Sequence, residues 1–388
     1  MSRRSLVTTA LSRGLAANRT AATVAINGFD WAFRRQSLVR SGKTWFELVH
    51  DTDLMSVRYY GLPDESHIEL SDGSDLAVER DQYAVPLVLV PPLGVTANTF
   101  DLMPNRSLAR FMAAKGFRTY MIDWGKPDKH DHGSLSLVDY SGRLMEEALA
   151  AVRAHSGAKD VSLMGWCMGG LISLIHMGLN GTGGIRNLVT AASPIDIRSS
   201  RAVMGMGDAL DAPAHLIERI IRLTGLEEKP GALSVPAWLT SLSFKMTAPV
   251  SSITTYWDLL MGLGDREFVV NYTTTSDYLN NMYMYPGGVV RDVVVQVAGH
   301  NKLASGQIEL DKEVADMARV TVPMLIFAGK RDHLVEPPVA RALLDIVGSD
   351  DKQFRLAQGG HMGVILGRKA LGDLWEPSAA WLAERSAA

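Results

Sequence analysis

The sequence predicts an α/β fold, in which helices cover both faces of a mostly parallel sheet and a helical insertion interrupts the pattern. Short apolar runs that end in turn residues alternate with segments of helical periodicity. This alternation is lost between residues 193 and 304 and then returns. The chain has 388 residues, of which 47% are apolar, and this is enough to bury a sizeable core.

The expected elements follow one another along the chain. Short leading strands are expected within residues 46–60 and 67–70. The strands of the main sheet are expected at 87–90, 118–122, 160–164, 188–192, 324–328 and 354–356, and the helices at 107–115, 137–152, 167–181 and 339–347. Strands that alternate with helices in this way form a parallel sheet with both faces covered.

Three regions follow from this pattern. Residues 1–83 hold an N-terminal amphipathic helix and the leading strands, residues 84–192 and 305–388 form the core, and residues 193–304 form a cap. The N-terminal helix is predicted from Ala22, Ile26, Phe29 and Phe33, which recur at helical spacing. It could pack on its own core, on a partner or on an apolar surface. The cap is rich in methionine and aromatic residues, including Met204, Met206, Trp238, Tyr256, Trp257, Tyr283 and Tyr285.

Composition excludes several classes of protein. The formal net charge is −3, so there is no basic excess of the kind that binds nucleic acid. The single cysteine excludes an intrachain disulfide and suits a reducing compartment, so we expect a cytoplasmic protein. No apolar run approaches the roughly 20 residues of a transmembrane helix.

The only cysteine lies in a predicted sharp turn between a strand and a helix. The pattern is Gly165-Trp166-Cys167-Met168-Gly169, which is that of a nucleophile elbow with cysteine in the place of the commoner serine. The turn crowds the positions two before and two after the nucleophile, which favours glycine at both. The helix N-terminus favours a thiolate. These features predict an α/β-hydrolase fold with Cys167 as nucleophile; the alternative is a glycine-rich turn around a buried cysteine.

An acid and a base follow in the chain order of this fold. Asp332 comes just after the strand expected at 324–328, and His361 lies among glycines after the last expected strand. We expect Asp332 to orient His361, and His361 to act as the base for Cys167. His333 is the competing base, but its place beside Asp332 favours a supporting role in the second layer of residues around the site.

The oxyanion of the reaction requires two backbone donors. Met168, directly after the nucleophile, supplies one N–H. The second should come from the loop after strand 87–90, where Pro92 has no N–H and Leu93 is the favoured donor, with Gly94 as the alternative. His130 and His132 lack a third ligand and a regular frame, so no metal site and no cofactor are expected.

A cysteine nucleophile indicates the substrate. It forms a thioester, and exchange of one thioester for another is nearly thermoneutral. Cys167 is therefore suited to accept an acyl group from a thiol carrier such as coenzyme A and to pass it to a hydroxyl. Whether water or an alcohol accepts the acyl group depends on how dry the pocket is.

At these motifs the chain resembles the polyhydroxyalkanoate synthases, particularly the shorter, two-subunit (class III-like) type. The similar segments are 100–108 (FDLMPNRSL), 121–125 (MIDWG), 165–170 (GWCMGG), 192–196 (ASPID), 332–335 (DHLV) and 359–364 (GGHMGV). The resemblance implies that Cys167 carries the growing chain, that His361 activates thiol and hydroxyl, and that Asp332 assists. It also implies 3-hydroxyacyl-coenzyme A as substrate.

Two other functions remain open from the sequence. One is a cysteine-dependent esterase or thioesterase of the same fold, which differs in the access of water. The other is a non-catalytic granule-associated or scaffold protein with an unreactive Cys167. The short, basic N-terminal region further predicts a homo-oligomer, a helical activating subunit or a polymer granule surface as partner, with Arg34, Arg35 and Arg40 close to Phe29 and Phe33.

Overall fold

The computed structural model describes residues 21–127, 130–201, 211–226, 229–246 and 258–386. The N-terminal residues 1–20 and the insertion residues Met204, Met206, Tyr256 and Trp257 lie outside this described part. Within it, no helix combines the length and the apolar character needed to cross a membrane.

A mostly parallel sheet forms the centre of the molecule, as predicted. It has eight strands in the order β1-β2-β8-β5-β9-β10-β13-β14. The parallel strands are β5 (Leu87–Val90), β8 (Thr119–Asp123), β9 (Val161–Trp166), β10 (Ile185–Ala191), β13 (Met324–Gly329) and β14 (Lys352–Ala357). The leading strands β1 (Glu47–Asp51) and β2 (Ser56–Tyr60) add antiparallel at one edge. Strands β5 and β9 are buried along their whole length, because helices cover both faces.

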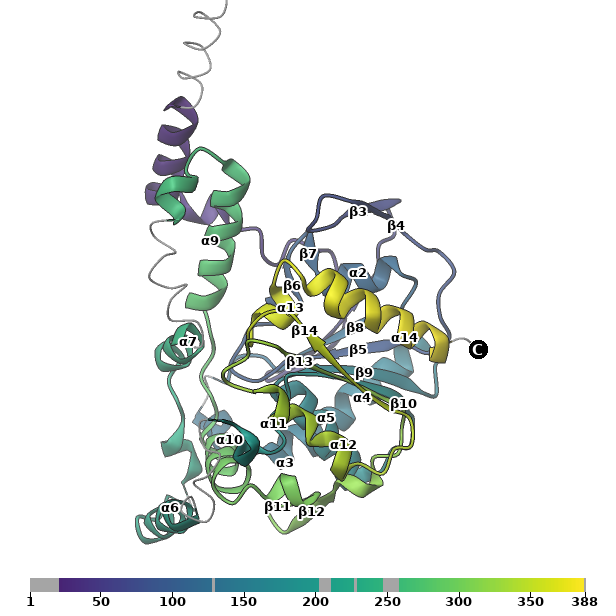
Figure 1. Ribbon diagram of the computed structural model, residues 1–388, viewed down its shortest axis with the longest axis vertical. Coiled ribbons are helices and arrows are strands. Elements are labelled where there is room, and N and C mark those ends of the chain that lie inside the picture. Colours follow the sequence, from purple (N-terminus) through teal and green to yellow (C-terminus); the bar gives the residue numbers. More distant parts are fainter. Residues whose placement is uncertain (1–20, 128–129, 202–210, 227–228, 247–257, 387–388) are drawn as a thin grey trace, which may run out of the picture.

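Helices lie on the two faces of this sheet. Figure 1 shows α2 (Leu108–Ala114) and α14 (Glu376–Ser386) above the sheet, with α4 (Met145–Ser156), α5 (Met168–Asn180), α11 (Pro337–Arg341) and α12 (Leu343–Ile346) below it. The helix expected at 137–152 is continuous from α3 (Leu137–Asp139) through a π-helical turn, η4 (Tyr140–Leu144), into α4. Ser107 caps α2 by accepting the N–H of Arg110 at 3.0 Å, and Gly116 follows with a left-handed φ of 87°.

Some elements differ from the prediction. The prediction of a single helix at 339–347 is wrong, because this segment forms two short helices, α11 and α12. The leading strand expected at 67–70 is confirmed as β3 (His67–Glu69), but its hairpin partner β4 (Asp75–Ala77) was not predicted. Two further hairpins were not predicted either: β6 (Asp101–Met103) with β7 (Arg106–Ser107), and β11 (Gln307–Leu310) with β12 (Glu313–Asp316). In the turn between β11 and β12, Asp311 and Lys312 adopt positive φ angles, which glycine usually supplies in such turns. Because neither residue is glycine, the sequence did not mark this turn.

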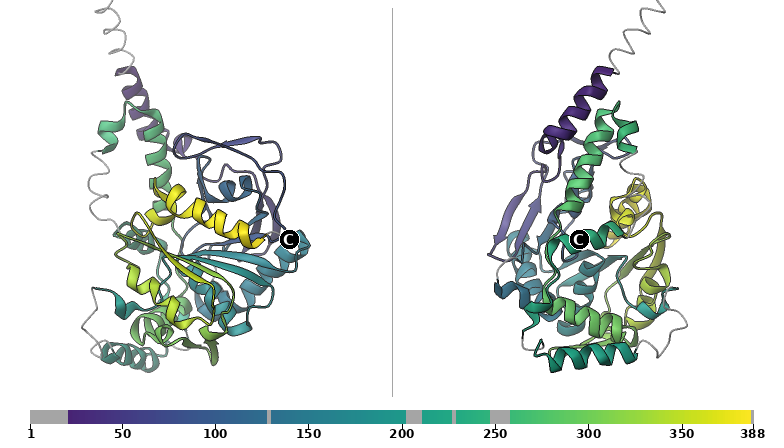
Figure 2. Two further views of the ribbon diagram at one scale, coloured as in Figure 1. Left: turned by 45° about the vertical axis from the view of Figure 1, so that its right-hand side comes forward. Right: turned by 90° about the vertical axis from the view of Figure 1, so that its left-hand side faces the viewer.

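The described part of residues 193–304, where the cap insertion is expected, forms a column of helices beside the sheet in both Figure 1 and Figure 2. Its described elements are η5 (Ile197–Ser199), α6 (Asp211–Leu223), η7 (Pro230–Leu233), α7 (Ala237–Met246), α9 (Arg266–Asn280), α10 (Gly287–Asp292), η8 (Val293–Gly299) and η9 (Lys302–Ser305). Near the core, Tyr278 of α9 packs with Val95, Leu102 and Met103, and its hydroxyl lies 2.5 Å from Thr99 Oγ1.

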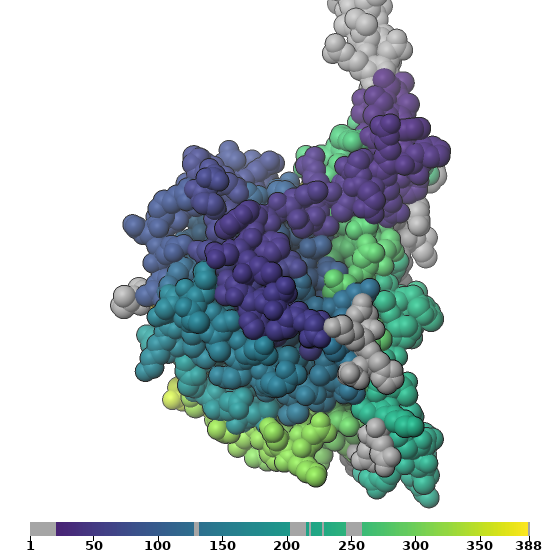
Figure 3. Space-filling view, turned by 180° about the vertical axis from the view of Figure 1, so that it is seen from behind, coloured from purple at the N-terminus to yellow at the C-terminus, as the bar shows by residue number. Residues whose placement is uncertain are grey.

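Residues 21–33 form the predicted N-terminal helix, which lies beside α9. Its Asp30 pairs with Arg266 at 2.7 Å, and Leu38, just beyond it, is buried against Leu259 and Val269. The predicted apolar face does not pack on the rest of the described chain: Phe29 and Phe33 are 51% and 76% exposed. Figure 3 shows this helix in purple beside the insertion, and the residues that follow it in the chain over the core.

Candidate active site

Cys167 lies in the sharp turn between β9 and α5, at the carboxyl end of a central strand. Its backbone has φ 51° and ψ −117°, which a side-chain-bearing residue adopts only under strain. A Cβ on Gly165 would lie 2.4 Å from the Gly170 nitrogen and 2.6 Å from the Gly169 carbonyl carbon. The crowding that was predicted for the two flanking glycines is therefore present, and the strain has a structural cause.

The next two glycines bring α5 close to its neighbours. A Cβ on Gly169 would lie 1.9 Å from the Val90 carbonyl oxygen at the end of β5. A Cβ on Gly170 would lie 2.1 Å from Ser193 Oγ. Met168, the first residue of α5, has a backbone N–H that belongs to the unpaired first turn of the helix. The start of α5 is thus held against the loop that follows β5.

Asp332 and His361 meet as a buried pair. Asp332 follows β13 and His361 follows β14, and their side chains are 0% and 1% exposed. His361 Nδ1 lies 2.8 Å from Asp332 Oδ2. The other carboxylate oxygen, Oδ1, accepts the backbone N–H groups of Leu334 and Val335, both at 2.9 Å. The carboxylate is therefore oriented on one side by its own loop and on the other by the imidazole.

His361 also responds to the charge of Cys167. Burial lowers the pKa of His361, but the negative charge of Cys167 and the hydrogen bond to Asp332 outweigh burial and raise it to about 10. A hydrogen bond with Cys167 also raises the pKa of His361, and the Nε2 atom is buried. Because Nδ1 is bonded to Asp332, Nε2 is the ring atom that can exchange a proton with Cys167 or with a substrate atom.

The loop after β5 is fixed by contacts from two sides. Trp124 Nε1 donates to the Pro91 carbonyl oxygen at 2.9 Å, and the backbone N–H of Tyr283 donates to the Gly94 carbonyl oxygen at 2.8 Å. Leu93 between them is buried, at 2% exposure. This loop carries the predicted second oxyanion donor and is bonded directly to the insertion.

Other predicted residues lie farther from this arrangement. His333 is exposed, and none of its described contacts is a hydrogen bond to Asp332 or His361. His176 is buried on α5, with Nδ1 2.8 Å from the Ser141 carbonyl oxygen, in keeping with a structural role. Within the described ranges, no group of three His, Cys, Asp or Glu side chains is arranged to hold a metal ion.

Two aromatic side chains are neighbours of the site. The Trp166 ring is fully buried, with its centroid 5.4 Å from that of His361. A Cβ on Gly94 would lie 2.3 Å from the Tyr285 ring, so the ring fills the space beside this glycine. Burial, and then the charge of Cys167, raise the pKa of the Tyr285 phenol. Trp166 is next to the nucleophile in the sequence, where its bulk is expected to narrow the pocket. Tyr285 is one of the aromatic residues expected in the cap, but no local signal placed it against the loop after β5.

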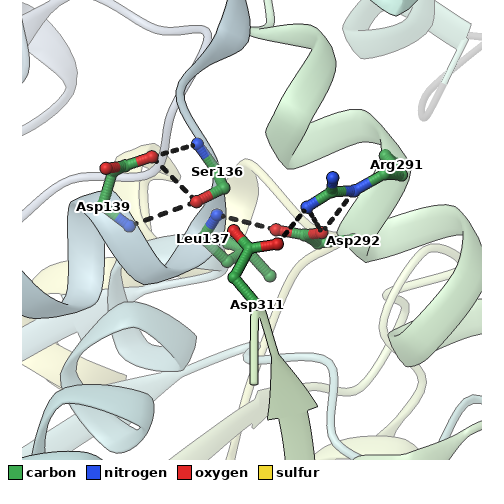
Figure 4. Close-up of polar contacts among 6 residues, drawn as sticks. All are labelled: Ser136, Leu137, Asp139, Arg291, Asp292 and Asp311. Carbon is green, nitrogen blue, oxygen red and sulfur yellow. Dashed lines mark hydrogen bonds and ion pairs between the residues drawn. The ribbon is translucent and has the colours of Figure 1, made fainter. Parts of the chain in front are cut away.

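The insertion is anchored to the core by a buried carboxylate. Figure 4 shows Asp292 Oδ2 accepting the backbone N–H of Leu137 at 3.0 Å, at the start of α3. Arg291 bridges Asp292 and Asp311, at 2.8 Å and 2.9 Å. Burial raises the pKa of Asp292, and the charge of Arg291 opposes this effect. Ser136 and Asp139 form a capping box at the same end of α3, in which each side chain accepts the backbone N–H of the other residue. Residues of the core and of the insertion therefore both bond the free N–H groups at the start of this helix.

Comparison with known proteins agrees with the geometry. The sequence profile described as the alpha/beta hydrolase family matches residues 87–369, most of the chain. The chain belongs to the alpha/beta hydrolase family. This alpha/beta hydrolase also superposes on the monoglyceride lipase of Saccharomyces cerevisiae with a TM-score of 0.52 and 14% identity, covering 90% of this chain and 97% of that one. At this identity the similarity shows the fold alone.

The resemblance to polyhydroxyalkanoate synthases is confirmed by curated relatives. The chain is 29% identical over 358 residues to a poly(3-hydroxyalkanoate) polymerase subunit PhaC of Haloferax mediterranei. The match covers 90% of this chain and 66% of that protein. A poly(3-hydroxyalkanoate) polymerase subunit PhaC of Allochromatium vinosum is 27% identical over 301 residues, with 78% and 81% covered. These homologues indicate that this alpha/beta hydrolase is an enzyme.

Proposed function

We propose that this protein is an acyltransferase of polyhydroxyalkanoate synthesis, with Cys167, His361 and Asp332 as its catalytic triad. The observation that carries the proposal is the buried hydrogen-bonded pair of Asp332 and His361. The charge of Cys167, at the strained turn, raises the pKa of the His361 imidazole. The raised pKa of His361 favours an imidazolium in the resting enzyme, which can give a proton to the leaving group of the first step. The related polymerase subunits support 3-hydroxyacyl-coenzyme A as the acyl donor.

The proposed reaction has two half-reactions. In the first, the Cys167 thiolate attacks the thioester carbonyl carbon, the bond to the coenzyme A sulfur breaks, and the leaving thiolate takes a proton from His361. In the second, His361 removes a proton from a hydroxyl group, whose oxygen attacks the acyl–Cys167 carbonyl. The new ester forms, and Cys167 leaves as the thiolate. The N–H groups of Met168 and Leu93 are the proposed donors to the oxyanion in both steps.

Water access separates this proposal from a cysteine esterase or thioesterase. Cys167 is only 8% exposed, and the insertion contributes Tyr285 to its surroundings. A dry nucleophile favours transfer of the acyl group to an alcohol over hydrolysis, because water is kept from the thioester. A non-catalytic scaffold would not require the strained elbow or the ordered Asp332–His361 pair.

The decisive experiment incubates the full chain with 3-hydroxybutyryl-coenzyme A. Free thiol, polymer and free hydroxy acid are followed together over time. Thiol release matched by polymer supports the acyltransferase. Thiol release matched by free 3-hydroxybutyrate would support the hydrolase, and no thiol release, with or without a helical partner subunit, would support the scaffold.

The proposal includes a partner for the N-terminal region. The exposed Ile26, Phe29 and Phe33 support docking of this helix on a second copy, on a helical activating subunit or on the granule surface. Removal of residues 1–40 should then change the sedimentation of the protein and lower its turnover together. Equal turnover and equal sedimentation of the truncated and full chains would remove this role. A reducing, cytoplasmic setting suits the free thiol that the reaction needs.

A further inference from the structure

Backbone hydrogen bonds and close backbone contacts attach the segment after Tyr285 to the core. The N–H of Val289 donates to the Leu135 carbonyl oxygen at 2.9 Å, and Asp292 accepts the N–H of Leu137. A Cβ on Gly288 would lie 2.4 Å from the Ser134 carbonyl oxygen, so the backbones touch there. The start of α10 therefore has one fixed position on the core, and Tyr285 lies two residues before it.

Tyr285 is also fixed from the side of the insertion. Its backbone forms a two-way antiparallel bridge with Val235, at 2.9 Å and 3.0 Å, and Tyr283 bonds to the Gly94 carbonyl. Gly94 has φ 75° and no side chain, and the Tyr285 ring fills the space that a side chain would take. Burial, and then the charge of Cys167, raise the pKa of Tyr285, so its phenol stays protonated.

We propose that Tyr285 is the specificity-determining residue of the acyl site: its fixed ring lies against Gly94, in the loop whose start touches the first turn of α5 after Cys167, and limits the size of the acyl group that the thiol can accept. The limit is set by the ring and not by the hydroxyl. Because the backbone on both sides of Tyr285 is bonded, a large acyl group cannot displace the ring by a local shift of the chain. Small 3-hydroxyacyl groups are therefore favoured. The part of this inference that concerns acyl-coenzyme A rests on the proposed function.

Thiol alkylation tests the inference without requiring turnover. Cys167 is the only cysteine, so modification of the full chain reports on this site alone. The rates with iodoacetamide, a small reagent, and with N-phenylmaleimide, a bulky one, are compared in wild type, Tyr285→Phe and Tyr285→Ala. We expect Tyr285→Ala to raise the rate with the bulky reagent by about tenfold or more relative to the small one, and Tyr285→Phe to keep the wild-type ratio.

Two further variants control for folding. Tyr285→Leu should give an intermediate ratio and guards against a cavity that collapses in the alanine variant. Tyr272→Ala removes a tyrosine of the insertion that packs with Leu38, Leu259 and Val269, away from Cys167. This variant should keep the wild-type ratio. An unchanged ratio in both Tyr285→Ala and Tyr285→Leu, or an equal rise in Tyr272→Ala, would overturn the inference.

Substrate preference then links the residue to the reaction. In Tyr285→Ala, the ratio of kcat/KM for 3-hydroxyoctanoyl- over 3-hydroxybutyryl-coenzyme A should rise by about tenfold or more. A changed alkylation ratio without turnover of either thioester would refute the proposed function and leave the role of Tyr285 in place. Turnover of both thioesters with an unchanged preference in Tyr285→Ala would refute the role of Tyr285 and leave the proposed function in place.

Discussion

The core and the insertion use their apolar side chains in opposite ways. In the core, strands β5, β9 and β13 are buried from end to end, and even the glycines of the elbow are in contact with neighbouring backbone. The described part of the insertion is attached through a few backbone and side-chain bonds, and many of its large apolar side chains face outward. Among them are Leu216, Ile220, Leu223, Trp238, Leu242, Leu260 and Met261.

This difference separates two kinds of substitution. A change in the core alters packing that also positions Cys167, so stability and activity should fall together. A change at an exposed apolar residue removes little buried area, so the fold should persist while any association through that surface weakens. The predictions below test this contrast, beginning with the largest expected effect.

Removal of the nucleophile should have the largest effect. Cys167→Ala should lower acyl transfer by a factor on the order of 10³ or more, because no other residue can carry the acyl group. Cys167→Ser should lose most activity, since an alcohol ionises far less readily than a thiol. Turnover of 3-hydroxybutyryl-coenzyme A is measured beside thermal unfolding, which should change little. Full activity of the alanine variant would exclude Cys167 as nucleophile.

The two neighbouring histidines should differ strongly. His361→Gln should lower both turnover and the alkylation rate of Cys167 by roughly 10²-fold or more, because a general base typically contributes 10²–10⁴. His333→Gln is the matched control and should cost much less, since His333 is exposed and makes no described hydrogen bond to Asp332. If His333→Gln were the more damaging variant, the base would have been assigned to the wrong histidine.

The close approach at the elbow should be visible in stability. Gly169→Ala should lower the free energy of unfolding by about 3 kcal/mol, since its Cβ would overlap the Val90 carbonyl oxygen. Gly142→Ala provides a control, because no atom lies within 4 Å of the Cβ it would add. In this helical segment alanine should be neutral or stabilising, by up to about 1 kcal/mol. Denaturant unfolding measures both variants, and equal midpoints would argue against the backbone contact.

The Asp332–His361 pair should give a pH-dependent stability. The pKa of His361 is raised from 6.5 to about 10, so the stabilisation it provides is complete below about 6.5 and is lost as pH rises through 10. The difference in unfolding free energy between wild type and His361→Gln should therefore be largest near pH 6 and shrink at alkaline pH. A difference that grows with pH would mean that His361 is neutral in the resting state.

The smallest effect on stability is expected at the N-terminal helix. Phe33→Ser should change the free energy of unfolding by less than about 0.5 kcal/mol, because the ring is 76% exposed. Leu38→Ala, at a buried position close by in the chain, should cost about 2–5 kcal/mol. Chemical unfolding compares the two, and sedimentation tests whether Phe33→Ser alone alters association. A large loss of stability in Phe33→Ser would show that this face packs against the protein itself.

Much of the site could be predicted from the sequence, because its features are local. The Gly165–Gly169 spacing determines the sharp turn, since only glycine fits the crowded positions beside Cys167. Asp332 and His361 each follow an apolar run directly, and parallel strands bring their carboxyl ends to one edge of the sheet, so chain order was enough to pair them. These short-range rules depend on backbone sterics and strand direction and need no knowledge of distant contacts.

Only the tertiary structure decided which residues from distant segments meet. The contact of Tyr285 with Gly94, and the bond from Asp292 to the start of α3, join parts of the chain with no shared local pattern. The helical spacing of Phe29 and Phe33 predicted a helix, but the direction of that face depends on how Asp30 and Leu38 pack against the insertion. Periodicity determines that a face exists; which surface covers it, or leaves it exposed, depends on the packing of the whole chain.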